Sequence, residues 1–316
     1  MMLALAAVGV SAKAENPGMP ERVSFYFAAH QDDWQLFMNP AAFEDVTRPA
    51  SRAVFIYVTA GDAGFGTGKG SRRHPYYLAR ERGAELAVRF MADAENTASG
   101  IEEAGTVEIN GHKVRRVAYR NTVSYFLRLA DGGLSGRGYA ATGHQSLRRL
   151  ADAEIASMMA IDGSTSYQGW ADLAATVRQI VDRERGSARA ILLNASEPEA
   201  RTNFGDHPDH QMTARLVGES TAGLVCAERV FHVAYASAKL PENLGGQERD
   251  LKTAVFAVTV AGIRELDHSA NWRWYRLAYL GRSYKRAVPA SAPCDPSKSA
   301  AAAVAGVPAA AATSRP

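Results

Sequence analysis

Residues 23–34 read VSFYFAAHQDDW, an apolar run that ends in one imidazole and two carboxylates. The run is dense in aromatic and β-branched residues, which is typical of a strand covered on both faces in a parallel sheet. Polar groups placed directly after such a strand must be desolvated or held by partners at the floor of a cleft. A metal ion would supply that partner, so the segment predicts both a central strand and a functional site.

Apolar runs of the same kind recur along the chain and alternate with stretches of helical spacing. Strands are predicted over residues 53–59, 188–195 and 230–236, with a strand pair around Val107 and Val117. Helices are predicted over residues 77–92, 208–224 and 251–266. This alternation favours a Rossmann-like α/β fold with a largely parallel sheet and helices on both faces. In such sheets ligands bind beyond the carboxyl ends of the strands, so the functional residues should follow strands.

The composition is that of a globular chain and excludes several classes of protein. The 316 residues are 47% hydrophobic and 22% charged, which excludes disorder throughout and a collagen-like fibre. The 36 basic and 33 acidic residues are spread along the chain, whereas nucleic-acid binders usually gather Lys and Arg in one stripe. We therefore expect a single domain over residues 15–286 and no nucleic-acid partner.

The two ends of the chain differ from this body. Residues 1–14 read MMLALAAVGVSAKA, an apolar stretch too short to span a bilayer that ends in a small-x-small motif. This pattern predicts a signal peptide, a periplasmic or secreted protein, and no transmembrane segment in the mature chain. Residues 287–316 are rich in Ala, Pro and Ser and lack aromatic residues, which predicts a disordered tail.

The two cysteines, Cys226 and Cys294, can form at most one disulfide bond. They are too few for a disulfide scaffold and lack the close spacing of a structural zinc site. A bond would pin the expected tail to the body of an exported protein. Two unpaired thiols fit the sequence equally well.

A second polar cluster follows the predicted strand at 188–195. Residues 206–210 read DHPDH, and Pro208 fits the first position of a helix. His207 and His210 then flank the first helical turn, where rigid backbone would hold a ligand. Free N–H groups at this turn also favour negative charge that develops nearby.

The cluster after the first strand complements this second one. On a tight turn His30 and Asp33 can point to the same side, while Asp32 points elsewhere and stays free for proton transfer. Together with one histidine of the DHPDH segment, His30 and Asp33 make a two-His, one-carboxylate set with open positions. Such a set is typical of a catalytic rather than a structural metal site.

The ordered set of motifs, from the first strand to the DHPDH segment, resembles the LmbE-like or PIG-L family of zinc-dependent deacetylases, which remove acetyl groups from N-acetylglucosamine conjugates. The family's first motif, A-H-P-D-D-E, corresponds to AHQDDW at residues 29–34. Residues 59–64 (TAGDAG) and 82–85 (RGAE) are similar to its T-x-G-E-x-G loop and its R-x-x-E motif. The chain departs from the family at Gln31 and Trp34, which bears on substrate and loop shape more than on chemistry.

The resemblance implies a role for each matched residue and a zinc-dependent hydrolysis that releases acetate and a free amine. It implies zinc ligation by His30, Asp33 and His210, general-base catalysis by Asp32, oxyanion stabilisation or amine protonation by His207, orientation of that imidazole by Asp209, and substrate binding by Arg82. We also expect Trp34, beside the metal motif, to form an aromatic wall of the substrate pocket. The family's tyrosine before the second motif has no clear counterpart.

Two other functions would use the same residues. A zinc amidase would act on an N-acyl amine that is not a sugar, and a metal-bearing carbohydrate-binding protein would bind without turnover. Binding alone does not need a free carboxylate at Asp32, which favours an enzyme. A two-His, one-carboxylate site holds Zn²⁺ but also other divalent metals such as iron and manganese.

A glycine-rich loop follows the predicted strand at 53–59. Residues 61–70 read GDAGFGTGKG, and this spacing fails the pattern of a phosphate-binding P-loop. Lys69, Arg72 and Arg73 make the loop cationic enough to attract a phosphate or carboxylate on the substrate. A solvated surface loop is the alternative.

Overall fold

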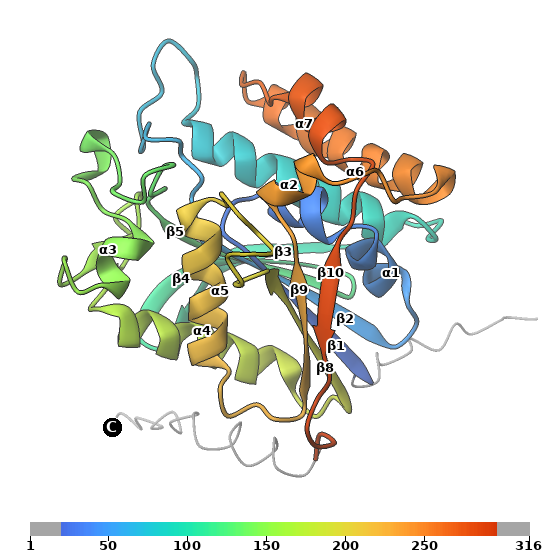
Figure 1. Ribbon diagram of the computed structural model, residues 1–316. Coiled ribbons are helices and arrows are strands. Elements are labelled where there is room, and N and C mark those ends of the chain that lie inside the picture. The colour runs from blue at the N-terminus through green and yellow to red at the C-terminus, as the bar shows by residue number, and fades with distance from the viewer. Residues whose placement is uncertain (1–19, 296–316) are drawn as a thin grey trace, which may run out of the picture.

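A mixed sheet of eight strands forms the centre of the computed structural model, which describes residues 20–295 (Figure 1). The strand order is β10-β9-β8-β1-β2-β5-β4-β3. The strands are β1 (Arg22–Ala28), β2 (Ser51–Thr59), β3 (Glu102–Ile109), β4 (His112–Tyr119), β5 (Thr122–Leu129), β8 (Ala190–Ser196), β9 (Ala227–His232) and β10 (Lys285–Val288). Strands β9, β8, β1, β2 and β5 are parallel, and the strands at both edges are antiparallel. A separate small sheet pairs β6 (Met158–Met159) with β7 (Ser166–Tyr167).

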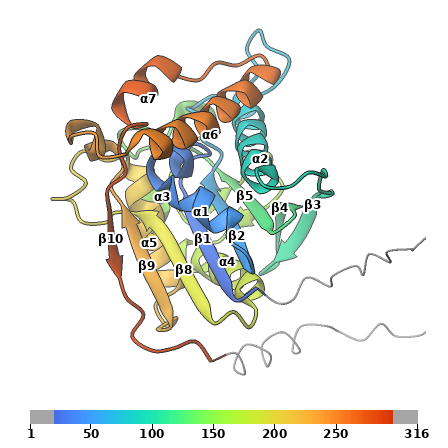
Figure 2. The same cartoon turned by 90° about the vertical axis from the view of Figure 1, so that its right-hand side faces the viewer.

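Helices cover both faces of the large sheet. They are α1 (Ala41–Thr47), α2 (Tyr76–Asp93), α3 (Leu147–Ala151), α4 (Trp170–Arg185), α5 (Pro208–Ser220), α6 (Gly246–Glu265) and α7 (Trp272–Ala278), with short turns η1 (Trp34–Met38), η2 (Ala140–Thr142) and η3 (Tyr235–Lys239). Helices α2, α6 and α7 lie on one face, and α4 and α5 lie on the other (Figures 1 and 2). Within residues 20–295, none of the helices combines the length and the apolar character that crossing a membrane requires.

Side chains that alternate along β1 build a separate core on each face. Val23, Phe25 and Phe27 point into a core shared with α3, α4 and α5. Tyr26 and Ala28 point into a second core shared with α1, α2, α6 and α7. Successive side chains of a strand point to opposite faces, so a strand that is apolar throughout must be covered on both.

The predicted α/β class with a largely parallel sheet is confirmed, and every predicted strand and helix overlaps an observed one. The strand pair around Val107 and Val117 is the β3–β4 hairpin. Strand β5 was not predicted, because the turn that precedes it carries no glycine or proline. Arg120 takes the positive φ of 52° in this turn, so the sequence has no signal that separates β4 from β5.

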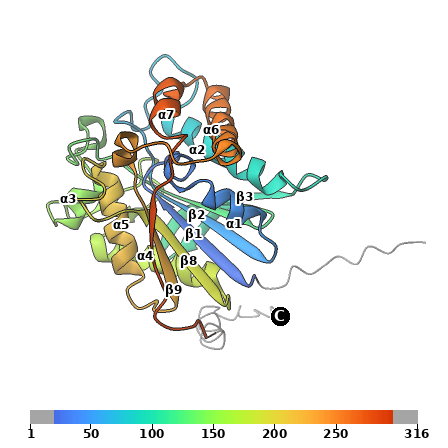
Figure 3. The ribbon, with the colours of Figure 1, turned by 45° about the vertical axis from the view of Figure 1, so that its right-hand side comes forward.

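Strand β1 is the point from which strands are added to the sheet in both directions. From β1 the chain adds β2 and then β5 on one side, and it later adds β8 and then β9 on the other. Figure 3 shows β2, β1, β8 and β9 side by side in this order. The carboxyl ends of β1 and β8 therefore flank the switch point, where open α/β sheets bind their ligands.

The two ends of the chain fall partly outside this structure. Residues 1–14, the expected signal peptide, and residues 296–316 of the expected tail lie outside the described residues. Residues 287 and 288, which we expected to begin the tail, instead belong to β10. They pair with β9, and this backbone pairing extends the ordered chain past the expected boundary.

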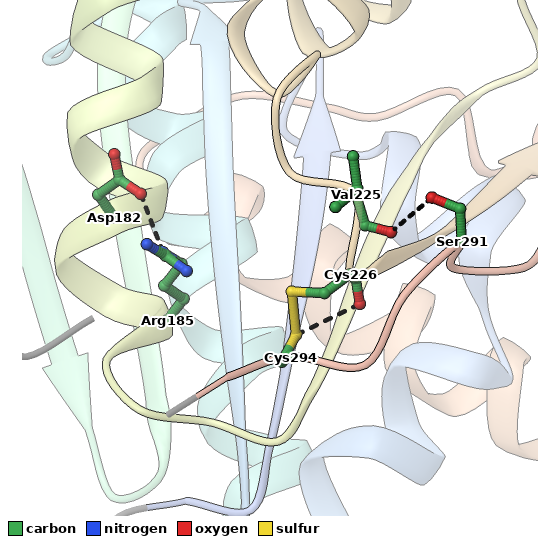
Figure 4. Close-up of a disulfide and its surroundings, with 6 residues drawn as sticks. All are labelled: Asp182, Arg185, Val225, Cys226, Ser291 and Cys294. Atoms are coloured by element: carbon green, nitrogen blue, oxygen red, sulfur yellow. Dashed lines mark hydrogen bonds and ion pairs between the residues drawn. A yellow bond between two sulfur atoms is a disulfide. The ribbon is translucent and has the colours of Figure 1, made fainter. Parts of the chain in front are cut away.

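A disulfide bond between Cys226 and Cys294 resolves the alternative that the sequence left open (Figure 4). Cys226 directly precedes β9, at the amino end of the parallel strands and therefore opposite the carboxyl ends of β1 and β8. The hydroxyl of Ser291 donates a hydrogen bond to the carbonyl of Val225 beside it, at 3.2 Å. The bond thus ties the segment after β10 to the sheet.

We expect the double variant Cys226→Ala/Cys294→Ala to lose stability but keep its activity. The bond joins residues 68 apart in sequence, and releasing such a loop increases the entropy of the unfolded chain. The free energy of unfolding, measured by urea denaturation, should fall by about 2–4 kcal/mol. An unchanged denaturation midpoint would contradict this role.

Candidate active site

The side chains of the two polar motifs meet at the carboxyl ends of β1 and β8. A small cavity of about 70 Å³ lies at this point. Its lining residues are His30, Asp32, Asp33, Leu36, Phe37, Arg80, Asp131, His207, Tyr235 and Tyr275. Segments far apart in sequence therefore form one polar hollow at the switch point of the sheet.

The three predicted metal ligands lie with one donor atom each in a tight triangle. His210 Nε2 is 3.0 Å from Asp33 Oδ1 and 3.3 Å from His30 Nδ1, and His30 Nδ1 is 3.6 Å from Asp33 Oδ1. Ligands bonded to zinc at about 2.0–2.1 Å in a tetrahedron are separated by about 3.3 Å. These side chains can therefore hold a tetrahedral metal ion without rearrangement, and their role as ligands remains a prediction.

Asp206 orients His210 toward this triangle. The Nδ1 of His210 lies 2.7 Å from Asp206 Oδ1, and both side chains are buried. When Nδ1–H donates to Asp206, the Nε2 lone pair of the neutral ring faces an oxygen of Asp33. Burial opposes protonation, but Asp206 and Asp33 raise the pKa of His210 well above its usual value. A proton is thus favoured between Nε2 and Asp33, and a metal ion can replace that proton.

His30 and Asp33 hold each other in place across the same turn. The backbone N–H of His30 donates to Asp33 Oδ2 at 2.7 Å, which leaves Oδ1 for the triangle. Burial opposes ionisation of Asp33, but the positive charges of His210 and His30 lower its pKa. Burial also opposes the charged form of His30 and so lowers its pKa, but the carboxylates of Asp33 and Asp209 have the larger effect and raise that pKa to about 10. Both shifts show that this site attracts positive charge.

A second group of possible ligands shares His30 with the first. It comprises His30, Asp131, His207 and Asp209, all buried. Its donor atoms are spread more widely, from 3.4 Å between His30 Nε2 and Asp209 Oδ2 to 3.8 Å between His30 Nε2 and Asp131 Oδ2 and 4.0 Å between His207 Nε2 and Asp131 Oδ1. We favour the first group as the metal centre because all three of its distances, 3.0–3.6 Å, lie near the spacing of tetrahedral ligands.

We expected the Asp209 side chain to orient the imidazole of His207, but the structure shows a different contact. The backbone N–H of Asp209 donates to His207 Nδ1 at 3.1 Å, so Nε2 carries the hydrogen of the neutral ring. The Asp209 carboxylate is nearer to His30 Nε2, at 3.4 Å, than to His207 Nδ1, at 3.8 Å. Burial and the charges of His30 and His210 lower the pKa of His207 to about 2. His207 is therefore a neutral hydrogen-bond donor.

Gly132 allows the close approach that positions Asp209. Its backbone N–H donates to Asp209 Oδ2 at 2.9 Å. A Cβ atom at residue 132 would lie 2.6 Å from Asp209 Oδ1, which is too short for a non-bonded contact. Only glycine lets the segment after β5 pack this closely against the start of α5.

Asp32 belongs to neither group of possible metal ligands and meets Arg80 of α2. An amino group of the Arg80 guanidinium donates to Asp32 Oδ1 in a short ion pair, and the other amino group donates to the carbonyl of Gly61 at 3.3 Å. Both charged side chains line the small cavity. The ion pair fixes the position of the Asp32 carboxylate at the cavity wall.

Arg82, the predicted substrate-binding arginine, lies elsewhere. Its Nε donates to Glu265 of α6 at 2.7 Å, and neither side chain lines the cavity. The two arginines are separated by two positions in α2, about 200° around the helix, so only one can face the site. Arg80, rather than Arg82, is therefore the arginine of α2 that lines the cavity.

Trp34 does not form the expected aromatic wall. Its side chain is fully buried, and its Nε1–H donates to the hydroxyl of Tyr57 at 2.8 Å. The indole packs against Phe55 within the core that β1 shares with α2 and α6. The aromatic residues that do line the cavity are Phe37, Tyr235 and Tyr275.

The residues that we did not assign differ in how well the sequence signals them. Asp206 was detectable, because it lies four residues before His210 and belongs to the same DHPDH run. Asp131 follows the unpredicted strand β5, so its position could not be recognised. Tyr235 follows β9, and Tyr275 is brought in by α7, neither within a motif. These two phenols are candidates for the oxyanion donor that had no counterpart.

Comparisons with known proteins identify little beyond this geometry. No protein-family profile matches the chain, and no curated protein sequence matches it. Among solved structures, the chain is similar to an N,N'-diacetylchitobiose deacetylase from Pyrococcus horikoshii in complex with its inhibitor MPG. The sequence identity is 15%, the alignment covers 88% of each chain, and the TM-score is 0.45. The function is therefore inferred from the chemistry of the site and from the motifs.

Proposed function

We propose that the protein is a zinc-dependent N-deacetylase that hydrolyses the N-acetyl group of an N-acetylglucosamine-type amino sugar or its conjugate. One observation carries this proposal. Two members of the triangle, His30 and Asp33, line one cavity with Asp32, a carboxylate that belongs to neither ligand group, and the third member, His210, is buried against them. A metal site with a separate base beside it fits hydrolysis better than binding alone. The resemblance of the ordered motifs supplies the amino-sugar substrate class.

The metal would be held by His30, Asp33 and His210. Bound there, zinc would make a water molecule more acidic and polarise the acetamide carbonyl. The surrounding charges fit a cation, since five carboxylates (Asp32, Asp33, Asp131, Asp206 and Asp209) and one guanidinium (Arg80) gather at the site.

Asp32 would act as the general base. It accepts a proton from the attacking water and then delivers that proton to the nitrogen of the departing amine, so that acetate and a free amine are released. Arg80 donates a hydrogen bond to this carboxylate and is itself held by a second hydrogen bond, to the carbonyl of Gly61. Arg80 therefore positions Asp32.

His207 would stabilise the negative charge that develops on the acetamide oxygen. Its Nδ1 is occupied by the Asp209 backbone N–H, which leaves Nε2–H as a donor at the cavity wall. A fixed donor in a buried site costs no reorganisation during the reaction. The phenols of Tyr235 and Tyr275 line the same cavity and would be further donors.

We also propose that the chain acts outside the cytoplasm, as its first residues predict. The disulfide bond between Cys226 and Cys294 supports this proposal, because such bonds persist in oxidising compartments.

Replacing the base should remove turnover but not metal binding. We expect Asp32→Asn to lower kcat for acetate release from N-acetylglucosamine conjugates by about 10²–10⁴-fold, the usual contribution of a general base. Zinc affinity should be unchanged, because Asp32 lies outside the triangle. Turnover equal to that of the wild type would contradict the role of Asp32.

The same assay separates the alternative functions. Hydrolysis of only non-sugar amides by the wild type would indicate the amidase. Binding of zinc and sugar without turnover would indicate a binding protein.

Metal binding should depend on the triangle and on Asp206. We expect the wild type to retain a single zinc ion after dialysis, His210→Ala to lose it, and Asp206→Asn to bind it about 10–100-fold more weakly. Isothermal titration calorimetry measures these affinities. His144→Ala is the matched control, because His144 is exposed and belongs to neither ligand group. Wild-type affinity in His210→Ala would place the metal elsewhere.

Turnover should depend on Arg80 of α2 but hardly on Arg82. We expect Arg80→Gln to lower kcat/KM by about 10-fold or more, because the lost hydrogen bonds to Asp32 and Gly61 include one between charged groups. Arg82→Gln should stay within about 2-fold of the wild type, since its partially exposed ion pair with Glu265 contributes little. Acetate-release kinetics test both variants, and the reverse order would restore the role first predicted for Arg82.

A further inference from the structure

Three neighbouring cavities lead from the proposed catalytic centre to the glycine-rich loop. The small cavity shares Asp32 and Tyr275 with a second cavity of about 370 Å³. The second cavity shares Tyr76 and Ser269 with a third one of about 410 Å³. The shared lining residues place the three cavities side by side, in a row from the proposed catalytic centre to the loop. The two larger cavities have the size of typical ligand sites.

The far cavity carries positive charge that no acidic residue balances. Lys69 and Arg72 line it, and its lining contains no Asp or Glu. In the described part of the chain neither residue forms an ion pair with a carboxylate, whereas the adjacent Arg73 pairs with Asp267 at 2.6 Å. The two cations of this cavity are therefore available to a ligand.

Arg72 is held in place by a neutral partner. Its Nη1 donates to His268 Nδ1 at 2.7 Å, and His268 Nε2–H donates to the carbonyl of His74 at 2.8 Å. This chain of hydrogen bonds fixes the guanidinium without neutralising it. Figure 2 shows the loop between β2 and α2 beside the end of α6, where these contacts occur.

Two aromatic rings form the wall between the cations and the catalytic centre. Phe65 is 62% exposed, and its ring meets that of Tyr76 edge to face at 6.0 Å. Tyr76 lines both larger cavities, so its ring marks the passage between them. An exposed phenylalanine beside two cations suits a ligand with an apolar or planar part next to an anionic group.

We propose that this far cavity is a specificity subsite for an anionic group, a phosphate or a carboxylate, on the part of the substrate remote from the acetamide. The inference rests on the proposed deacetylase function and narrows its substrate to acidic amino-sugar conjugates. Arg72 would contact two oxygens of the anion through its planar guanidinium, and Lys69 would add a point charge. Phe65 would pack against the aglycone that joins the anion to the sugar.

The kinetic test compares matched substrates that differ in one group. A phenyl N-acetylglucosaminide is compared with the same glycoside that carries a carboxylate or a phosphate on its phenyl ring. We expect the wild type to prefer an anionic form by about 10-fold in kcat/KM, the effect of one hydrogen bond to a charged group. The preferred anion distinguishes carboxylate from phosphate. The preference should shrink as NaCl is raised.

Three variants locate the preference. Lys69→Gln/Arg72→Gln should abolish the preference for the anionic glycoside over the neutral one. Lys69→Gln alone should reduce it; the Lys69 side chain forms no hydrogen bond in the described chain, so this change removes charge without loosening the loop. Arg73→Gln is the matched control, with the same charge change in the same loop, and should keep the full preference. An equal preference in the double variant and the wild type would overturn the proposal.

A binding measurement separates this inference from the function on which it rests. Phenyl phosphate and benzoate are titrated into metal-free protein, where no metal can capture the anion. We expect the preferred anion to bind the wild type and Arg73→Gln, and to bind Lys69→Gln/Arg72→Gln about 10-fold more weakly. Such binding without turnover of any glycoside would retain the subsite and reject the deacetylase. Turnover of the neutral glycoside, with neither anion preference nor binding, would reject the subsite alone.

Discussion

The repulsion among buried carboxylates is the constraint on which this site depends. Asp33 and Asp206 approach the two nitrogens of His210 at 3.0 and 2.7 Å, and both contacts are buried. The neutral imidazole can donate to only one of them, so the site is incomplete without a proton or a metal ion. The raised pKa values of His30 and His210 and the lowered pKa of Asp33 express this demand for positive charge.

The fold supplies the rigidity that such a cluster requires. Strand β1 is hydrogen-bonded to β2 on one side and to β8 on the other, with a core on each face. The turn after β1 and the first turn of α5 are therefore anchored between the two cores. A backbone so constrained can hold several carboxylates around the imidazoles although the carboxylates repel one another in the absence of a cation.

Around this rigid centre, further residues come from a helix and from the segments that flank it. Arg80 reaches Asp32 from α2, whereas the proposed anion subsite is formed by the loop before α2 and the segment after α6. The hydrogen bonds through His268 join that loop to that segment. In the proposed function the sheet would position the catalytic residues and the surface segments would select the substrate, as is common when loops lie on a rigid scaffold.

The sequence by itself determined the α/β class, the burial of β1 on both faces, and the meeting of the polar residues after β1 with the DHPDH segment. These outcomes depend on local patterns, because an apolar strand with polar residues at its carboxyl end dictates its own surroundings. The choice of His210 within that segment came from the resemblance of the motifs. Only the tertiary structure decided that Arg80 rather than Arg82 reaches Asp32, that Trp34 is core, and that Asp209 lies nearer to His30 than to His207. Those outcomes depend on helix rotation and on packing between distant segments. Arg80 and Arg82 are the same type of residue, but two positions in a helix turn their side chains about 200° apart, so they face different surroundings.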